Sequence, residues 1–319
     1  TYAKDIAFWQ AVQYLFYTQW QALKEYANDK HIQIIGDLPI YVALDSVDVW
    51  SSPQDFQLDA DLNPTEVAGC PPDGFSATGQ LWGNPLFDWD AMAQNGYAWW
   101  VRRIRHMCRI YDVVRIDHFR GFAGYYAIPY GNKTAEGGRW RTGPGYALFA
   151  AIKKKLGEPR IIAEDLGFLT DDVNALLRKC GYPGMKVLEF GFDSRDGGDY
   201  RPHGYPVNSI AYVGTHDNEP VNGWMATAAP EDVARAVRYL NLTKQEGYHW
   251  GMMRGIWASA AELSIVQAQD LLGLGHEARM NTPSTLGGNW CWRAKRGAFN
   301  DRLAVKLHDL TELYGRLPD

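Results

Sequence analysis

Short apolar segments alternate along the chain with longer segments in which apolar residues recur every three or four positions. Six segments contain mostly Ile, Val and Leu with little polar alternation, as strands buried on both faces do. They lie at residues 32–42, 112–119, 160–166, 185–192, 209–216 and 263–271. Helices are predicted at residues 1–29, 99–111, 145–156, 171–179 and 230–240. This order predicts βαβ units around a parallel sheet, and therefore the α/β class.

Two long segments interrupt this pattern. Residues 43–98 are rich in Pro, Asp and Trp, and residues 119–145 are rich in Gly and Tyr, so we expect loop subdomains inserted after strands. Six strands are two fewer than a closed (β/α)8 barrel contains. Either two N-terminal strands are missing, or the sheet is open and doubly wound. Because the first residue is Thr1 rather than Met, we expect the chain to begin inside a longer gene product.

The composition excludes several classes of protein. The 319 residues are 46% hydrophobic and 22% charged, which is ordinary for a folded globular chain. A net charge of -5 without a basic stripe argues against nucleic acid as a partner, and no apolar segment is long enough to span a membrane. The four cysteines are far apart, which predicts neither a zinc site nor a disulfide framework and favours a reducing cytoplasm. The oligomeric state stays open.

Aromatic residues are unusually numerous, with 13 Trp and 18 Tyr. Aromatic faces serve as platforms for pyranose rings in sugar-binding sites. The alternative for any single Trp is a place in the core or at a contact between helix and sheet.

Acidic residues follow the predicted strands. A carboxylate stands at the carboxyl end of five of them: Asp37, Asp117, Glu164, Asp193 and Asp217. In a barrel these strand ends converge on one mouth, where catalytic groups collect. One such acid could be an ion pair or a helix cap, but five together favour a functional site.

Retaining glycosyl transfer needs one ionised carboxylate that attacks the anomeric carbon and one protonated carboxyl that donates to the leaving oxygen. Arg115 lies two residues before Asp117, on the same side of a strand, and would hold Asp117 ionised as a nucleophile. Glu164 follows an apolar strand, which would raise its pKa and suit it to the acid role. Asp217 has His216 and Asn218 beside it as donors and would serve as a third acid.

Four groups of motifs carry a specific family resemblance. Residues 115–121 (RIDHFRG) and 214–218 (GTHDN) resemble signature regions of the α-amylase superfamily. Residues 71–85 (PPDGFSATGQLWGNP), and 280–283 (MNTP) together with 289–293 (NWCWR), resemble active-site loops of the 4-α-glucanotransferases, the amylomaltases and disproportionating enzymes of glycoside hydrolase family 77. The similarity covers essentially the whole chain. Two departures are the absence of a counterpart to the family's N-terminal region and the glycine at Gly74.

The resemblance implies a (β/α)8 barrel over residues 1–319 that lacks its first two strands, and transfer of α-1,4-glucan segments to the 4-hydroxyl of a glucose or maltodextrin acceptor. It implies Asp117 as nucleophile, Glu164 as acid/base and Asp217 as transition-state stabiliser, with no metal or organic cofactor. Substrate contacts are implied for Arg115, His118, His216, Trp82, Asp73, Asp193, Asn281 and Pro283. Asp37 fits a structural role and a sugar contact equally.

Two rival functions remain open, and a third is disfavoured. An α-1,4-glucan hydrolase would use the same three acids, and a catalytically silent glucan-binding protein would keep only the aromatic cleft. A phosphate-binding barrel enzyme is disfavoured because no Gly-rich phosphate loop precedes a helix.

Overall fold

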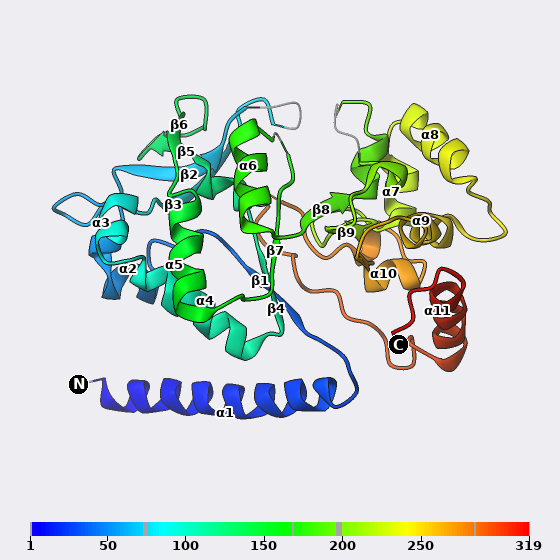
Figure 1. Cartoon of the computed structure of the whole chain (residues 1–319), viewed down its shortest axis with the longest axis horizontal. Coiled ribbons are helices and arrows are strands. Elements are labelled where there is room, and N and C mark those ends of the chain that lie inside the picture. Colours follow the sequence, from blue (N-terminus) through cyan, green and yellow to red (C-terminus); the bar gives the residue numbers. More distant parts are fainter. Residues whose placement is uncertain (1, 73–75, 168, 196–199, 284, 319) are drawn as a thin grey trace. The chain divides into compact units, whose positions relative to one another are not determined.

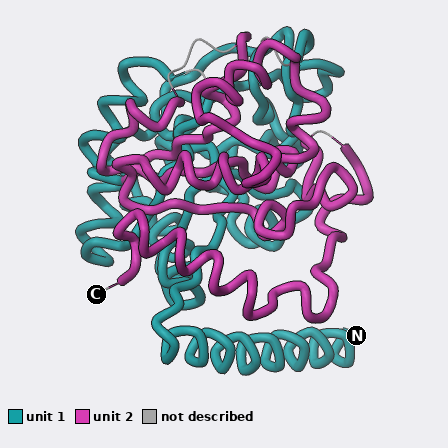
Figure 2. Tube along the Cα trace, turned by 90° about the vertical axis from the view of Figure 1, so that its right-hand side faces the viewer, with its two compact units in different colours: residues 1–182 teal, residues 183–319 magenta. Residues whose placement is uncertain are grey.

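The computed structural model describes residues 2–72, 76–167, 169–195, 200–283 and 285–318. The chain forms two compact units, residues 1–182 and residues 183–319, which Figure 2 colours separately. Each unit contains three parallel strands with helices between them.

Unit 1 is built on the parallel strands β1 (Ile35–Leu38), β4 (Val113–Ile116) and β7 (Ile161–Ala163), in the order β1-β4-β7. β4 and β7 are buried along their whole length, as their unbroken apolar sequences predict. The helices of unit 1 are α1 (Ala3–Asn28), α2 (Val47–Ser51), α3 (Trp89–Gln94), α4 (Ala98–Ile110), α5 (Tyr146–Leu156) and α6 (Asp171–Cys180). α4 packs against β1, β4 and α5 (Figure 1). The predicted strand positions are confirmed, although the strands are shorter than the apolar segments.

Local signals set the ends of α6. Asp171 and Asp172 stand in its first turn, where negative charge is favourable, and Gly181 follows its last turn with φ 75°. Glycine adopts this left-handed conformation without steric cost, so the helix stops there. The predicted helix at 171–179 is therefore confirmed to within one residue.

α1 is a long helix that runs along the edge of unit 1 (Figure 1). It is joined to α4 by hydrogen bonds from Trp20 Nε1 to the carbonyl of Ile110 (2.8 Å) and between Tyr17 and His106 (2.9 Å). No described residue of α1 is buried, and several of its large apolar side chains are exposed.

The two predicted insertions meet in a single antiparallel sheet. Its order is β3 (Gln80–Pro85), β2 (Glu66–Cys70), β5 (Gly124–Pro129) and β6 (Arg139–Thr142), so the segments 43–98 and 119–145 pair through β2 and β5. The 3-10 turns of this part are Pro53–Asp55 and Phe119–Phe122.

A cluster of aromatic side chains lies beneath the carboxyl end of β4. Trp100, Phe122, Phe149 and Phe119 are at most 2% exposed, and the Phe122 ring lies 5.1 Å from Trp100 and 5.2 Å from Phe149. Phe119 follows Asp117 by two residues and packs on Phe149 at 5.2 Å. The buried rings therefore fix the backbone that carries Asp117.

Gly36 leaves room for a neighbouring ring. A Cβ at this position in β1 would lie 1.9 Å from the Tyr111 ring. We expect Gly36→Ala to destabilise the protein by about 1–3 kcal/mol, because the ring or strand must move. Urea unfolding measures the difference. Gly124→Ala is the control, since its Cβ would lie 3.4 Å from the nearest atom, and equal midpoints for the two variants would contradict the prediction.

Unit 2 is built on the parallel strands β8 (Gly184–Val187), β9 (Ser209–Tyr212) and β10 (Leu263–Ile265). Its helices are α7 (Val221–Thr227), α8 (Pro230–Leu240), α9 (Tyr248–Trp257), α10 (Ala268–Leu271) and α11 (Asp301–Leu313), with 3-10 turns at Leu188–Phe192, Pro202–Gly204 and His276–Ala278. Among the described residues of both units, no helix is long and apolar enough to cross a membrane.

All three predicted strands of unit 2 are too long. The segment 209–216 leaves strand geometry after Tyr212, so Asp217 lies in a loop beyond the strand. The segment 185–192 leaves strand geometry after Val187 and continues as a 3-10 turn, so Asp193 follows that turn rather than a strand. The segment 263–271 splits into β10 and the short helix α10. An unbroken apolar sequence does not distinguish a strand from a buried helical turn, and here tertiary packing decided.

Candidate active site

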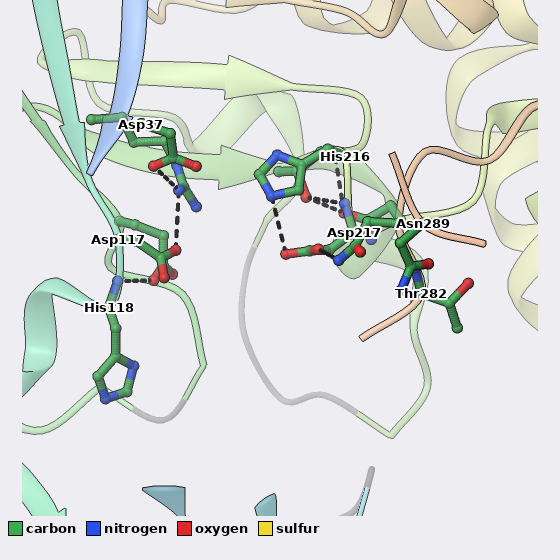
Figure 3. A network of polar contacts seen from close by, with 12 residues as sticks. Asp37, Asp117, His118, His216, Asp217, Thr282 and Asn289 are labelled. Carbon is green, nitrogen blue, oxygen red and sulfur yellow. Dashed lines mark hydrogen bonds and ion pairs between the residues drawn. The ribbon is translucent and has the colours of Figure 1, made fainter. Parts of the chain in front are cut away.

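Asp117 directly follows β4, and its main-chain N–H donates to the carbonyl of Leu38 at 3.0 Å. Arg115 Nη1 donates to Oδ1 of Asp117 at 3.0 Å and to Oδ1 of Asp37 at 2.6 Å (Figure 3). The contact between Arg115 and Asp117 is the one that the two-residue period of a strand predicts. Both carboxylates thus share one buried guanidinium.

Arg115 stays protonated and positively charged. Burial lowers the pKa of the guanidinium, but the carboxylates of Asp37, Asp117 and Glu164 outweigh this effect and hold the pKa above its ordinary value. A permanent positive charge beside Asp117 favours the ionised form of that carboxyl group, which a nucleophile requires.

Glu164 directly follows β7 and is fixed by main-chain donors on both oxygens. The N–H of His118 donates to Oε2 at 2.7 Å, and the N–H of Leu166 donates to Oε1 at 2.8 Å. Burial, followed by the charge of Asp117, raises the pKa of Glu164 to about 7, while Arg115 and the two N–H donors act in the opposite direction. Glu164 can therefore hold or release a proton near neutral pH.

His118 is held in an uncommon backbone conformation. Its φ is 52°, in the left-handed region, and its ring meets Trp82 edge to face at 4.8 Å. Burial, together with the charge of Arg120, lowers the pKa of His118 to about 3, so the imidazole is neutral. In this conformation, which is uncommon for a residue other than glycine, the His118 N–H donates to Oε2 of Glu164.

Asp217 belongs to unit 2 and lies on the loop between β9 and α7. Asn281 Nδ2 donates to its Oδ1 at 2.6 Å, and His216 Nε2 lies 3.5 Å from its Oδ2 (Figure 3). The neighbouring Asn218, also expected to be a donor, accepts with its Oδ1 from the N–H and the hydroxyl of Thr215, both at 2.9 Å. The carboxylate is 42% exposed and can meet a ligand.

The sequence of the chain matches a known family. The sequence pattern of the family described as 4-alpha-glucanotransferase matches residues 1–299. The chain belongs to this 4-alpha-glucanotransferase family.

Relatives in the family are closely similar. The 4-alpha-glucanotransferase of Clostridium butyricum is 51% identical over 315 residues, which are 98% of this chain and 65% of the relative. That of Streptococcus pneumoniae serotype 4 is 50% identical over 317 residues, 99% of this chain and 63% of the relative. The chain thus spans just under two thirds of the length of these relatives.

The structure of the amylomaltase from Streptococcus agalactiae in complex with acarbose superposes with a TM-score of 0.92 at 45% identity, covering 97% of this chain and 62% of the other. The fold of this 4-alpha-glucanotransferase family member is therefore α/β, of the (β/α)8 barrel type with inserted subdomains. This match favours the partial barrel over the open, doubly wound alternative.

The remaining predicted substrate-binding residues differ in their surroundings. Trp82 is 36% exposed and packs on His118 in unit 1, while Pro283 is exposed in unit 2. Asp193 accepts hydrogen bonds from Arg195 Nε (2.9 Å) and Nη2 (2.7 Å), and these bonds lower its pKa. Asp73 lies outside the described residues. Among those described, no group of three or more His, Cys, Asp or Glu side chains could hold a metal ion.

The sequence did not predict a role for Arg279 or Glu219, which lie near Asp217. Arg279 donates hydrogen bonds to Glu219, to the carbonyl of Asp217 and to the carbonyl of Asn281. It therefore joins the loop that carries Asp217 to the segment that carries Asn281. Trp290, quoted only within a motif, has φ 60° and lies 4.9 Å from the His216 ring. A charged residue two positions before Asn281 was the available signal for Arg279, but such spacing alone does not identify a partner.

Proposed function

We propose that the full-length protein containing this chain is a 4-α-glucanotransferase that acts by retaining double displacement. The observation that carries the proposal is the pair of acids in unit 1. Asp117 contacts a permanently charged guanidinium, whereas the half-buried Glu164 has a pKa of about 7. A nucleophile and a general acid need these two different environments.

In the first step, an oxygen of Asp117 bonds to the anomeric carbon while the glycosidic bond breaks. The leaving chain takes the proton of Glu164 on its 4-oxygen. In the second step, Glu164 removes the proton of an acceptor 4-hydroxyl, that oxygen bonds to the anomeric carbon, and Asp117 departs. Two inversions restore the α linkage.

The other residues of the site support these steps. Asp217, held by Asn281, would stabilise the positive charge that develops on the sugar ring. The neutral His118 is proposed to bind sugar hydroxyls together with His216 and Arg115. Trp82 is proposed to offer an aromatic face. Asn281, Asp193, Pro283 and Asp73 are proposed to line the glucan cleft.

The proposed substrates are maltodextrins and other α-1,4-glucans, as donor and as acceptor. Membership of the family and the likeness to an amylomaltase solved with acarbose support this proposal. The cytoplasmic location expected from the spacing of the cysteines is also a proposal.

Incubation of the full-length protein with maltotriose tests the function. We expect a ladder of shorter and longer maltodextrins, with few new reducing ends, because the linkages are exchanged rather than hydrolysed. Reducing ends that rise together with the loss of maltotriose would identify a hydrolase instead. Maltodextrin binding without any product would identify a silent glucan-binding protein. Chromatography of the products and a reducing-sugar assay distinguish the three outcomes.

A further inference from the structure

The guanidinium of Arg279 contacts three different residues of unit 2. Nη1 donates to Oε1 of Glu219 at 2.7 Å, Nη2 donates to the main-chain carbonyl of Asp217 at 2.6 Å, and Nε donates to the main-chain carbonyl of Asn281 at 2.9 Å. The Arg279 side chain is 20% exposed and that of Glu219 is 14% exposed. Charged hydrogen bonds in such partly buried surroundings are short and strong.

These three acceptors lie on two segments that are distant in sequence. Asp217 and Glu219 follow β9, whereas Asn281 follows the 3-10 turn His276–Ala278. The two segments also meet directly, since the N–H of Asn281 donates to the carbonyl of His216 at 3.1 Å. Arg279 therefore fastens the backbone of Asp217 to the backbone of Asn281.

This connection bears on the carboxylate of Asp217. The amide of Asn281 donates to that carboxylate at 2.6 Å. This hydrogen bond forms only while the two segments keep their positions relative to each other. Glu219, the anionic partner of Arg279, is held in turn by His276 Nδ1 at 2.9 Å, and its main-chain carbonyl accepts from Gln267 Nε2 at 3.2 Å. Glu219, the residue that pairs with Arg279, is thus held in place by its own contacts.

We propose that Arg279 is a positioning residue for Asp217. It holds the loop after β9 against residue 281 so that the Asp217 carboxylate faces the reacting sugar. The proposal rests on the proposed function, in which Asp217 stabilises the transition state. Lysine cannot replace arginine here, because one ammonium group cannot reach three acceptors that the planar guanidinium reaches from separate nitrogens.

The test compares Arg279→Gln and Arg279→Lys with the unmodified full-length protein. We expect Arg279→Gln to lower kcat for maltotriose about 100-fold and to change KM less than about threefold, because a misplaced Asp217 weakens transition-state binding more than substrate binding. Arg279→Lys is expected to lower kcat by at least about 10-fold. If the Gln variant does not fold, the Lys variant is used for the test in its place.

Arg254 provides a matched control in the same unit. It also joins a carboxylate to a carbonyl, donating to Glu246 Oε1 at 2.7 Å and to the carbonyl of Leu240 at 3.0 Å. Arg254→Gln loses comparable contacts away from Asp217, so we expect kcat within about twofold of the unmodified protein. Equal losses of kcat in the Arg254 and Arg279 variants would show a general effect of stability and overturn the proposal.

A crystal structure of the Arg279→Gln protein, or of the Lys variant in its place, separates this proposal from the proposed function. We expect the Asp217 carboxylate to leave hydrogen-bonding distance of Asn281 Nδ2. An unmoved carboxylate would overturn the positioning role, whatever the activity. If the unmodified protein does not redistribute maltotriose, the proposed function fails, and the position of Asp217 in the crystal still decides what Arg279 does.

Discussion

Asp117→Asn in the full-length protein is expected to lower the rate of maltotriose redistribution by at least about 1,000-fold, or about 4 kcal/mol of transition-state stabilisation. An amide has nearly the same shape as a carboxylate, so the packing on Arg115 and the fold should persist. The amide lacks the negative charge that is proposed to attack the anomeric carbon. Chromatography of maltotriose products at equal protein concentration measures the loss.

Asp112 offers a control at the opposite end of β4. It precedes β4, where it lies 3.2 Å from Lys24 Nζ and accepts from the N–H of Ile34 at 2.8 Å. In a parallel barrel the amino ends of the strands serve stability and the carboxyl ends serve catalysis. Asp112→Asn should therefore keep the rate within a few-fold. Comparable activity of the Asp117 and Asp112 variants would remove Asp117 from the role of nucleophile.

Glu164→Gln is expected to have the second large effect. It should also lower the rate of maltotriose redistribution by at least about 1,000-fold. Glutamine cannot donate a proton to the leaving 4-oxygen. With an α-glucosyl fluoride donor the first step needs no such proton, because fluoride leaves unaided. We therefore expect the variant to form the covalent intermediate with the fluoride and to release it slowly. Mass spectrometry of proteolytic fragments should place the added sugar on Asp117.

The acid role also predicts a pH dependence for the unmodified protein. With a pKa of about 7, Glu164 is mostly protonated below pH 7 and loses the proton above it. Because the first step consumes that proton, kcat/KM for maltotriose should fall about tenfold per pH unit well above pH 7. The formation of the intermediate from the fluoride should not show this fall. A flat maltotriose profile between pH 6 and pH 9 would contradict the assignment of Glu164 as acid.

Local sequence was enough to predict much of unit 1. Unbroken apolar segments located β4 and β7, and the acidic residues and glycine around α6 located that helix. The contact between Arg115 and Asp117 followed from their spacing, because residues two apart point to the same side of a strand. These features depend on residues within a few positions of one another, which is why the chain alone determines them.

Five strand-end acids had looked equivalent by position, and the structure distinguishes their surroundings. Asp193 follows a 3-10 turn and pairs with Arg195, two residues away. Asp37 shares the guanidinium of Arg115 with Asp117. The environment that raises the pKa of Glu164 includes burial, which no spacing reveals.

The sequence by itself determined where the six parallel strands lie along the chain, the α/β class, the motifs of the family and the contact of Asp117 with Arg115. Only the tertiary structure decided that the two insertions form one sheet through β2 and β5, and that Asn281 and Arg279 hold Asp217. Those contacts join residues more than 50 positions apart. Such contacts form only when the helices and strands pack against one another in the tertiary structure. Local propensity carries no information about that packing.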